Sequence, residues 1–452
     1  MDKFSGYSEY KDSESHWAGK IPAHWLSERL GSLLLERGEN NQKLLVEKVL
    51  SVVKDLGVIP YEDKGNIGNK ASDDIGRYKV VRIGDLVINS MNVIIGSVGI
   101  SKYIGVLSPV YLVLKVRDKE KIYNEYVGWI FQIKEFQQGL KRLGYGILDH
   151  RLRIPMDNLK LEKLLVPPFE EQVYISSFLE YETAKIDRLI GKQERLIELL
   201  KEKRQAVISH AVTKGLNRHV KLKKIDSLYI DSIPEHWTVM SLRYAISKIE
   251  QGSSPLCDNN VPDHGDIGVI KISAVKKGVF NEVESKCLFN RVDFDCRYLI
   301  KKGDLLVTRG NTPELVADAC YVKEKPIRDV MLSDLVYRLV PNNKSIAQFV
   351  CFVLLSDYIR HQIKLDARGS SMTMAKVSQE HIKSWVVALP PICEQEEISA
   401  YLYEQIASFD KLFDVAHLLI NKLKERRSAL ISAAVTGKID VRNWETDAKD
   451  TA

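Results

Sequence analysis

The sequence lacks the features that mark a secreted, membrane-spanning or metal-binding protein. Its opening residues are polar and contain no apolar signal-peptide core, and no run of about 18 apolar residues could span a membrane. All six cysteines lie in the second half, and none forms a CxxC pair (Cys257, Cys287, Cys296, Cys320, Cys351 and Cys393). We therefore expect no membrane contact and no metal site, and we expect reduced thiols in a cytoplasmic protein.

The motifs of several enzyme classes are also absent. The sequence contains no G-x-x-x-x-G-K-[ST] loop, H-E-x-x-H helix, G-x-S-x-G turn or G-x-G-x-x-G turn, and no Asn/Asp-Pro-Pro-aromatic motif of amino-methyltransferases. The net charge is only +6, from 66 basic and 60 acidic residues. This excess permits a nucleic-acid partner without demanding one, because local clustering of charge matters more than the total. We expect no catalytic residue in this chain.

The chain does contain a long internal repeat, in the order variable, constant, variable, constant. Two short motifs each occur twice: IPAHW at 21–25 and IPEHW at 233–237, and PPFEEQ at 167–172 and PPICEQ at 390–395. Residues 170–213 match residues 393–436 at 20 of 44 positions without a gap. Because a repeat of this kind signals duplicated structural units, we expect a pseudo-two-fold internal repeat.

Each constant segment is predicted to form one long helix. A Pro-Pro pair and the glutamate after it suit a first helical turn, and no proline interrupts the rest of either segment. Gly215 and Gly437 stand where the helices should stop. Roughly 42 residues at ~1.5 Å each would give a helix of about 60 Å.

Apolar residues recur along these helices in steps of four and three. The first walk visits Ile175, Leu179, Glu182, Ile186, Leu189, Gln193, Leu196, Leu200, Lys203, Val207 and His210, and an equivalent walk starts at Ile398 and includes Leu412 and Leu419. This heptad spacing predicts a packed coiled-coil seam. Since the two copies are so alike, the simplest arrangement pairs them with each other, antiparallel, within one chain.

Polar residues interrupt this seam at matched places, Glu182 with Gln405 and Lys203 with Arg426. Either the seam reaches solvent there, or these residues fix the register or face a partner protein. Together with the neighbouring Arg204 and Arg427, they are the candidate contacts with partner subunits.

The variable blocks combine strand-like and helical patterns. Runs at 85–90, 94–100, 110–116, 268–275, 304–308 and 335–340 are rich in Val, Ile and Leu, and helical stretches come after them at 123–143 and 346–365. Gly84-Asp85 and Gly303-Asp304 are interpreted as turns that enter a buried strand. The predicted class is α+β: two mixed α/β domains separated by two long helices packed as an antiparallel coiled coil. The predicted boundaries are 1–165, 166–216 (helix), 217–388, 389–440 (helix) and 441–452 (tail).

Polar loops between the strands carry groups suited to DNA, because Arg, Asn and Gln can read base edges while Lys, Ser and Thr hold phosphates. Each of these residues could equally be a solvated loop residue. The candidates in the first block are Arg77, Tyr78, Lys79, Asn89, Ser90, Asn92, Tyr145, His150 and Arg151, and those in the second are Lys276, Lys277, Arg309, Asn311, Arg368, Ser370, Ser371 and Thr373. The repeated His24-Trp25 and His236-Trp237 pairs are identical in two otherwise different blocks. They are therefore interpreted as structural anchors or partner contacts and not as base contacts.

Taken together, these motifs resemble a known family, the specificity subunits of type I restriction-modification systems. The resemblance covers nearly the whole chain and rests on the PP-x-x-EQ helix starts, the helix ends KEKRQAVISHAVT and KERRSALISAAVT, the IP-x-HW segments and the GDL turns. One departure is that Cys393 replaces the first glutamate of the PPFEEQ copy, Glu170.

Membership would imply two target-recognition domains that read the two halves of an asymmetric double-stranded DNA site, separated by two conserved helices. It would also imply two modification (methyltransferase) subunits bound to the helices, and restriction subunits that complete a translocase and nuclease. The chain itself would bind no cofactor, since S-adenosylmethionine and ATP with Mg²⁺ would be used by those partners.

Two alternatives stay open from the sequence. One is a stand-alone DNA methyltransferase or nuclease with a degenerate motif, which would transfer methyl groups without partners. The other is a coiled-coil scaffold that binds only protein.

Overall fold

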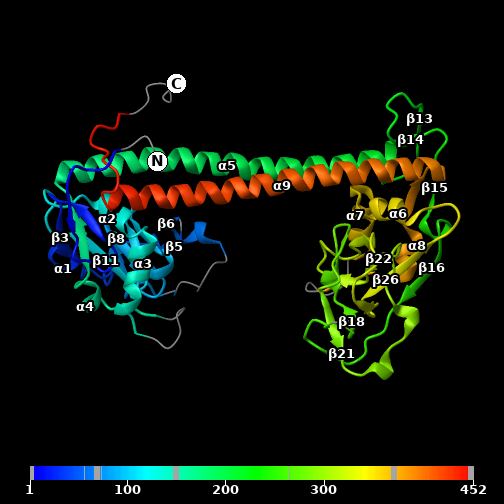
Figure 1. The fold of residues 1–452 in the computed structure, drawn as a ribbon, viewed down its shortest axis with the longest axis horizontal. Helices are drawn as coiled ribbons and strands as arrows, with labels where there is room; N and C mark the ends of the chain where they lie inside the picture. The colour runs from blue at the N-terminus through cyan, green and yellow to red at the C-terminus, as the bar shows by residue number, and fades with distance from the viewer. Residues whose placement is uncertain are drawn as a thin grey trace. The chain divides into compact units, whose positions relative to one another are not determined.

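The computed structural model describes residues 5–54, 56–65, 72, 74–145, 152–263, 265–367 and 374–445. The chain divides into two compact units, unit 1 (residues 1–193 and 417–452) and unit 2 (residues 194–416). Each unit combines mixed strands and short helices with one part of each of two long helices (Figure 1). The predicted α+β class is confirmed. Because the unit boundaries fall within the long helices, the sequence-based domain boundaries stay predictions.

Unit 1 is built on an antiparallel sheet of strand order β4-β11-β8-β9. All four residues of its central strand β8 are buried, with Leu86 and Ile88 in the main core and Val87 in a smaller cluster on the other face. The elements of unit 1 before the first long helix are β1 (Tyr10–Asp12), β2 (Lys20–Pro22), β3 (Leu26–Arg29), α1 (Leu30–Leu33), β4 (Leu34–Glu36), β5 (Leu50–Val53), β6 (Gly57–Pro60), β7 (Lys79–Val81), β8 (Leu86–Asn89), β9 (Val98–Ile100), β10 (Gly105–Leu107), β11 (Tyr111–Val116), α2 (Asn124–Ile130), α3 (Lys134–Gly139), α4 (Met156–Leu159) and β12 (Lys163–Val166).

Unit 2 repeats this plan with the sheet β16-β26-β22-β24, and it adds a second sheet, β17-β21-β18-β25. Its central strand β22 is buried on both faces in the same way, Leu305 and Val307 on one and Leu306 on the other. Its elements between the long helices are β13 (Leu222–Lys224), β14 (Ser232–Pro234), β15 (Thr238–Ser241), β16 (Ile246–Gln251), β17 (Cys257–Asp258), β18 (Ile267–Ile270), β19 (Val275–Lys276), β20 (Val279–Phe280), β21 (Ser285–Leu288), β22 (Leu305–Thr308), β23 (Gly310–Asn311), β24 (Ala319–Tyr321), β25 (Asp329–Met331), β26 (Val336–Pro341), α6 (Ala347–Leu355), α7 (Asp357–Asp366), β27 (Ala375–Lys376), α8 (Gln379–Ser384) and β28 (Val386–Leu389).

Two sequence expectations about the short helices are wrong in detail. The helical stretch at 123–143 is broken into α2, α3 and a 3₁₀ turn at Leu140–Leu143. The stretch at 346–365 is broken at Ser356, whose backbone is extended and whose buried hydroxyl donates to the Val353 carbonyl oxygen at 2.5 Å. A serine that bonds to nearby backbone in this way competes with helix continuation.

The two constant segments form the long helices α5 (Phe169–Lys214) and α9 (Ile392–Val435), as predicted, and they pack side by side (Figure 1). In unit 1 the start of α5 shares a core with the end of α9, through Ile175 and Ala434 among others. In unit 2 the end of α5 shares a core with the start of α9, through Val212 and Ile398. The helices are therefore antiparallel within each unit.

The heptad prediction is confirmed for one of its two series and wrong in part of the other. Buried residues seven apart on α9 are Leu402, Phe409, Ala416, Leu423 and Leu430, and Leu179 and Ile186 follow the same step on α5. A second buried series has an 11-residue step: Ile175, Ile186, Ile197 and Ile208 on α5, and Ile398, Phe409, Ile420 and Ile431 on α9. Eleven residues span three turns at about 3.67 residues per turn, close to the 3.6 of a straight helix. A nearly straight helix therefore keeps these side chains on one face.

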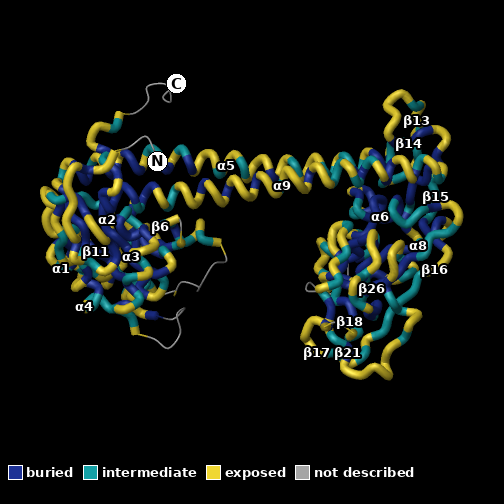
Figure 2. The backbone as a smooth tube through the Cα atoms, in the orientation of Figure 1, coloured by how far each residue is buried: buried dark blue, intermediate teal, exposed yellow. Residues whose placement is uncertain are grey.

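Four leucines placed in the seam by the heptad walk are in fact exposed. Leu189 and Leu196 of α5 are 47% and 42% exposed, and their repeat equivalents on α9, Leu412 and Leu419, are 50% and 40% exposed. Exposed positions alternate with buried ones along both helices (Figure 2). The heptad rule merged two different apolar series, one that packs the helices together and one that faces solvent.

Candidate nucleic-acid interface

In the first turn of each long helix, a glutamate side chain binds the His-Trp pair of the domain that precedes the helix. In unit 1 the carboxylate is Glu171, in the first turn of α5, where the helix dipole favours negative charge. It accepts a hydrogen bond from Trp25 Nε1 at 3.0 Å and from the Tyr7 hydroxyl, and its Oε2 lies 2.8 Å from His24 Nε2. Burial, and then the hydrogen bond to Glu171, raises the pKa of Tyr7.

Unit 2 repeats this anchor at the start of α9. Glu394 Oε2 accepts from Trp237 Nε1 at 3.0 Å and lies 2.8 Å from His236 Nε2. The recurring His-Trp pairs are thus structural anchors between domain and helix, as the sequence favoured. The glutamine of each PP-x-x-EQ motif adds a second clamp, since Gln172 Oε1 accepts from the Tyr123 amide and Gln395 Oε1 accepts from the Ile346 amide.

Glycines close the far ends of the same helices. Gly215 comes directly after α5 with φ +72, and Gly437 lies just beyond α9 with φ +69, both in the left-handed region. A Cβ on Gly437 would meet Pro22 Cδ at 2.3 Å, and one on Gly215 would lie 3.2 Å from Trp237 Cζ2. Each helix end therefore lies against an IP-x-HW segment. The positive φ favours glycine at both ends, and at Gly437 a Cβ would also clash with Pro22.

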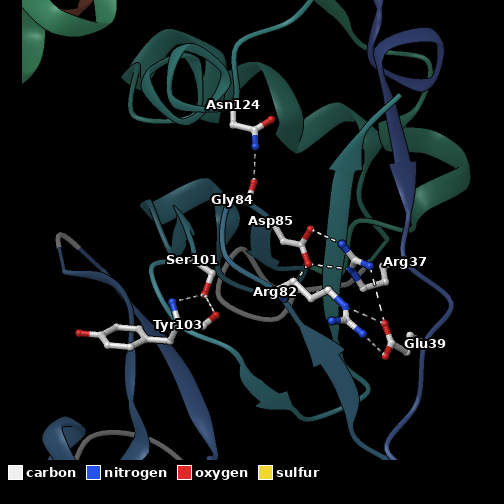
Figure 3. A network of polar contacts seen from close by, with 8 residues as sticks. All are labelled: Arg37, Glu39, Arg82, Gly84, Asp85, Ser101, Tyr103 and Asn124. Carbon is white, nitrogen blue, oxygen red and sulfur yellow. Dashed lines mark hydrogen bonds and ion pairs between the residues drawn. The ribbon is translucent and has the colours of Figure 1, made fainter. Parts of the chain in front are cut away.

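The GDL turns are structural, as predicted. In unit 1 the buried Asp85 pairs with Arg37 (Nε to Oδ2, 2.7 Å) and accepts from the Arg82 amide at 2.8 Å, while Arg82 pairs with Glu39 (Figure 3). The Gly84 carbonyl oxygen accepts from Asn124 Nδ2 at 2.8 Å. In unit 2 Asp304 repeats the turn, since its Oδ2 accepts from the Lys301 amide at 2.9 Å.

Most of the described DNA-contact candidates of unit 1 are engaged within the fold. Tyr78 is buried and its hydroxyl accepts from the Ser72 amide at 2.8 Å. Lys79 Nζ donates to Glu36 Oε1 at 2.9 Å and to the Tyr111 carbonyl oxygen at 2.8 Å. Ser90 is buried and donates to the Val110 carbonyl oxygen at 2.9 Å. These contacts favour a structural role for the three residues.

The other unit 1 candidates divide by exposure. Asn89 is buried, and its Oδ1 accepts from the Met91 amide at 3.1 Å, while Asn92 is half-buried in the same turn. Arg77 and Tyr145 are both exposed, so their side chains can reach a ligand. His150 and Arg151, like Arg368, Ser370, Ser371 and Thr373 of unit 2, lie outside the described residues.

In unit 2 the structure gathers two candidates, Lys276 and Asn311, around one cleft of about 680 Å³. Its full lining is Ser254, Pro255, Leu256, Cys257, Val269, Ile270, Lys271, Ile272, Ser273, Val275, Lys276, Lys286, Asn311, Thr312, Leu315, Asp318, Ser333, Asp334, Leu335 and Met374. Strands β17, β18, β19, β21 and β23 all contribute residues to it.

Lysines dominate the charge of this cleft. Lys271, Lys276 and Lys286 line it, and within the described part of the chain none of the three forms an ion pair. Sequence reasoning missed Lys271 and Lys286, because each stands alone in an apolar or mixed stretch. Only the pairing of β18 with β21 brings them to the same sheet.

Two further candidates of unit 2 lie beside the cleft. Lys277 is exposed at φ +47, and its amide donates to Asp318 Oδ2 at 2.9 Å. Burial raises the pKa of Asp318, against the hydrogen bonds that its carboxylate accepts from the backbone. Arg309 is half-buried, with Nη1 3.5 Å from the Asp334 carbonyl oxygen. Asp318 therefore supports the turn that presents the two lysines.

Two of the candidate subunit contacts form ion pairs between the long helices. In unit 1 Arg427 Nε lies 3.0 Å from Asp187 Oδ1, and in unit 2 Arg204 Nη1 lies 3.4 Å from Asp410 Oδ1. Lys203 and Arg426 are exposed, while Glu182 and Gln405 are half-buried.

Among the described residues, no helix is both long and apolar enough to cross a membrane.

The comparisons with known proteins agree on one family. Residues 234–425 match the model of the type I restriction modification DNA specificity domain. The chain is 24% identical, over 97% of its length and 98% of the relative's, to the type I restriction enzyme MjaVIII specificity subunit of Methanocaldococcus jannaschii. It is 21% identical to the EcoKI specificity subunit of Escherichia coli K12, covering 96% of this chain and 93% of that one.

Solved structures support the fold. A chain from a study of complex assembly and conformational transition of the type I R-M system aligns with TM-score 0.68 and 16% identity, over 93% of this chain and 99% of that one. The HsdS subunit of Thermoanaerobacter tengcongensis aligns with TM-score 0.50 and 14% identity, over 93% and 98% of the two chains.

Proposed function

Since the chain belongs to the family of type I restriction-modification specificity subunits, we propose that it addresses such a complex to DNA by reading a two-part site, one part with each unit. The single observation that carries this proposal is the duplicated scaffold with different loop chemistry. The sheets β4-β11-β8-β9 and β16-β26-β22-β24 share one topology. Yet Lys79 and Ser90 of unit 1 are engaged internally, while unit 2 has a lysine-lined cleft. Two similar readers with different surfaces fit an asymmetric site.

The long helices are proposed to carry two modification subunits. Each helix exposes a matched leucine pair seven residues apart, Leu189 with Leu196 and Leu412 with Leu419. Residues seven apart lie on nearly the same side of a helix. Exposed apolar side chains grouped in this way are typical of protein interfaces. Because the two pairs are repeat equivalents, they would offer two equivalent docking surfaces, one for each modification subunit.

In this assignment the chain supplies recognition, and its partners supply chemistry. The modification subunits would flip an adenine out of the duplex and methylate it with S-adenosylmethionine, and restriction subunits would use ATP and Mg²⁺. This chain would bind neither cofactor and would act in the cytoplasm. Lysine contacts to phosphates would make DNA binding strongly dependent on salt.

A methyl-transfer assay tests this division of labour. The purified chain, the purified modification subunit and the reconstituted complex are each given labelled S-adenosylmethionine and duplex DNA. We expect sequence-specific methylation only from the complex. Methyl transfer by the chain alone would contradict the proposal and support a stand-alone enzyme. A complex that assembles but binds DNA without sequence preference would support a protein-only scaffold.

A further inference from the structure

We propose that the lysine-lined cleft of unit 2 reads a G·C base pair, with Asn311 donating to the guanine and Asp334 accepting from the cytosine. This inference rests on the proposed function and makes it specific: it names the reading site of one unit, the residues that read, and the base pair that they select.

Asn311 presents a hydrogen-bond donor to the cleft. Its Oδ1 accepts from the Thr312 amide at 2.8 Å. Because an N–H group can be satisfied only by the oxygen of the side-chain amide, this contact fixes which end of Asn311 faces the chain. The Nδ2 amino group has no partner among the described residues. The position is held by β23, in which Asn311 pairs with Ala375 of β27.

The lysines add donors and positive charge around this amide. Lys276, exposed on β19, and Lys286, exposed on β21, line the same cleft as Asn311. Ser333 also lines it, and its buried Oγ has no hydrogen-bond partner among the described residues. A buried hydroxyl without a partner is costly, and such groups commonly mark a place where another molecule completes the bonding.

Asp334 supplies the complementary acceptor. Its backbone is occupied, because its amide donates to the Ser253 carbonyl oxygen at 3.1 Å and its own carbonyl oxygen accepts from Gln251 Nε2 at 3.1 Å. Its carboxylate accepts no hydrogen bond within the described part of the chain, and Asp334 lines the cleft. The backbone contacts thus fix the residue while leaving both side-chain oxygens for a ligand.

Lysine and amide donors beside the Asp334 carboxylate match a G·C pair better than the other pairings, because the second carboxylate of the lining, Asp318, already accepts from the Lys277 and Ala319 amides. In the major groove guanine presents two acceptors, N7 and O6, and cytosine presents the N4 amino donor. Adenine presents one acceptor and one donor, so an asparagine reads it with both ends of its amide. Asn311 has its oxygen turned to Thr312 and cannot use that geometry. The arrangement therefore fits a lysine or amide donor on guanine and the Asp334 carboxylate on cytosine N4.

The test uses the complete complex of this chain with its modification subunits, and duplex DNA that contains the sequence methylated by this complex. Each guanine of the half-site read by unit 2 is replaced in turn by 7-deazaguanine, which lacks the N7 acceptor. At one guanine we expect binding to weaken about tenfold, the size of one specific base contact. Asn311→Asp should abolish this sensitivity, whereas Asn343→Asp, a matched change at an exposed loop asparagine of unit 2, should leave it unchanged.

Two further variants separate reading from phosphate contact. Asp334→Asn should relax the preference for cytosine at the same base pair. Lys286→Ala should weaken binding to all DNA sequences alike. It should also reduce the slope of the logarithm of the binding constant against the logarithm of the salt concentration by about one. Insensitivity of every guanine to the 7-deaza replacement, or sensitivity that survives Asn311→Asp, would overturn the inference while leaving the proposed function intact. Loss of all sequence preference by the wild-type complex would instead overturn the proposed function.

Discussion

Arg427 of α9 and Asp187 of α5 form an ion pair, with Nε 3.0 Å from Oδ1, and the repeat reproduces this pair as Arg204 with Asp410. Asp187 and Asp410 are 223 residues apart in the sequence, and so are Arg204 and Arg427. In one pair α5 supplies the aspartate, and in the other it supplies the arginine. The pseudo-two-fold repeat is therefore visible at the level of single side chains.

These ion pairs should stabilise the helix pair only weakly, because both are partly exposed. A double-mutant cycle on Arg427→Ala and Asp187→Ala, measured by urea unfolding, should give a coupling free energy of about 0.3–1 kcal/mol. The Arg204 and Asp410 cycle is the matched comparison and should give a similar value. A coupling well above this range for only one pair would contradict the symmetry.

The 11-residue seam makes a sharper prediction. Ile197→Ala removes a side chain that is 5% exposed and should lower the free energy of unfolding by about 2–4 kcal/mol. Leu196→Ala removes its neighbour, which is 42% exposed, and should change the free energy of unfolding of the isolated chain by less than about 0.5 kcal/mol. Chemical denaturation of the two variants measures both values. The heptad walk includes Leu196 and not Ile197, so a larger loss for Leu196→Ala would contradict the 11-residue series.

The same leucine should matter for assembly. If Leu196 and Leu189 belong to a docking surface, Leu196→Ala should weaken binding of a modification subunit while the isolated chain keeps its stability. Titration calorimetry with the purified modification subunit measures this loss. Leu228→Ala is the control, because Leu228 is also exposed but lies outside both long helices. If the wild-type chain and both variants bound the modification subunit equally well, Leu196 would not belong to the docking surface.

The two helix-start anchors should differ in strength. Glu171 is more deeply buried than Glu394 and has three side-chain partners to its two. Glu171→Ala leaves buried donors without an acceptor, so we expect a loss of about 2–3 kcal/mol in the free energy of unfolding, against about 1–2 kcal/mol for Glu394→Ala. Guanidinium denaturation monitored by tryptophan fluorescence reports on both sites. A larger loss for Glu394→Ala would be inconsistent with these contacts.

Asp318 should leave a signature in the pH dependence of stability. Burial raises the pKa of Asp318 in the folded chain above its ordinary value of 3.8. The folded state therefore binds more protons than the unfolded state just above pH 3.8, and stability contributed by the protonated form is lost as pH rises through the raised pKa. Asp318→Asn should remove this fall. Denaturation midpoints of both chains from about pH 3.5 to 6 give the comparison, and parallel curves would argue against a raised pKa.

Much of the fold could be predicted because each motif occurs twice, so an interpretation of one copy could be checked against the other. The matched PP-x-x-EQ starts and the stop glycines Gly215 and Gly437 indicated the extent of both helices, and the His-Trp pairs were correctly interpreted as anchors. The seam could not be placed from apolar spacing alone. Leucines that face solvent and isoleucines that face the partner helix are equally apolar, and only packing separates them.

The candidate site was less predictable for a different physical reason. Loop composition cannot tell a side chain that bonds its own fold from one that is free, so Lys79 and Ser90 look like DNA contacts until their partners Glu36 and Val110 are known. Conversely, Lys271 and Lys286 gave no signal. They are separated in sequence and meet only through the pairing of two strands.

The central claim is that the two units read different parts of one DNA site. The most direct test sequences the methylated adenines in cells that carry this chain and its partner subunits, before and after residues 217–388 are replaced by the corresponding block of a relative. The account predicts an asymmetric two-part motif in which the replacement changes one part and preserves the other. A motif that changes in both parts, or that does not depend on this chain, would contradict it.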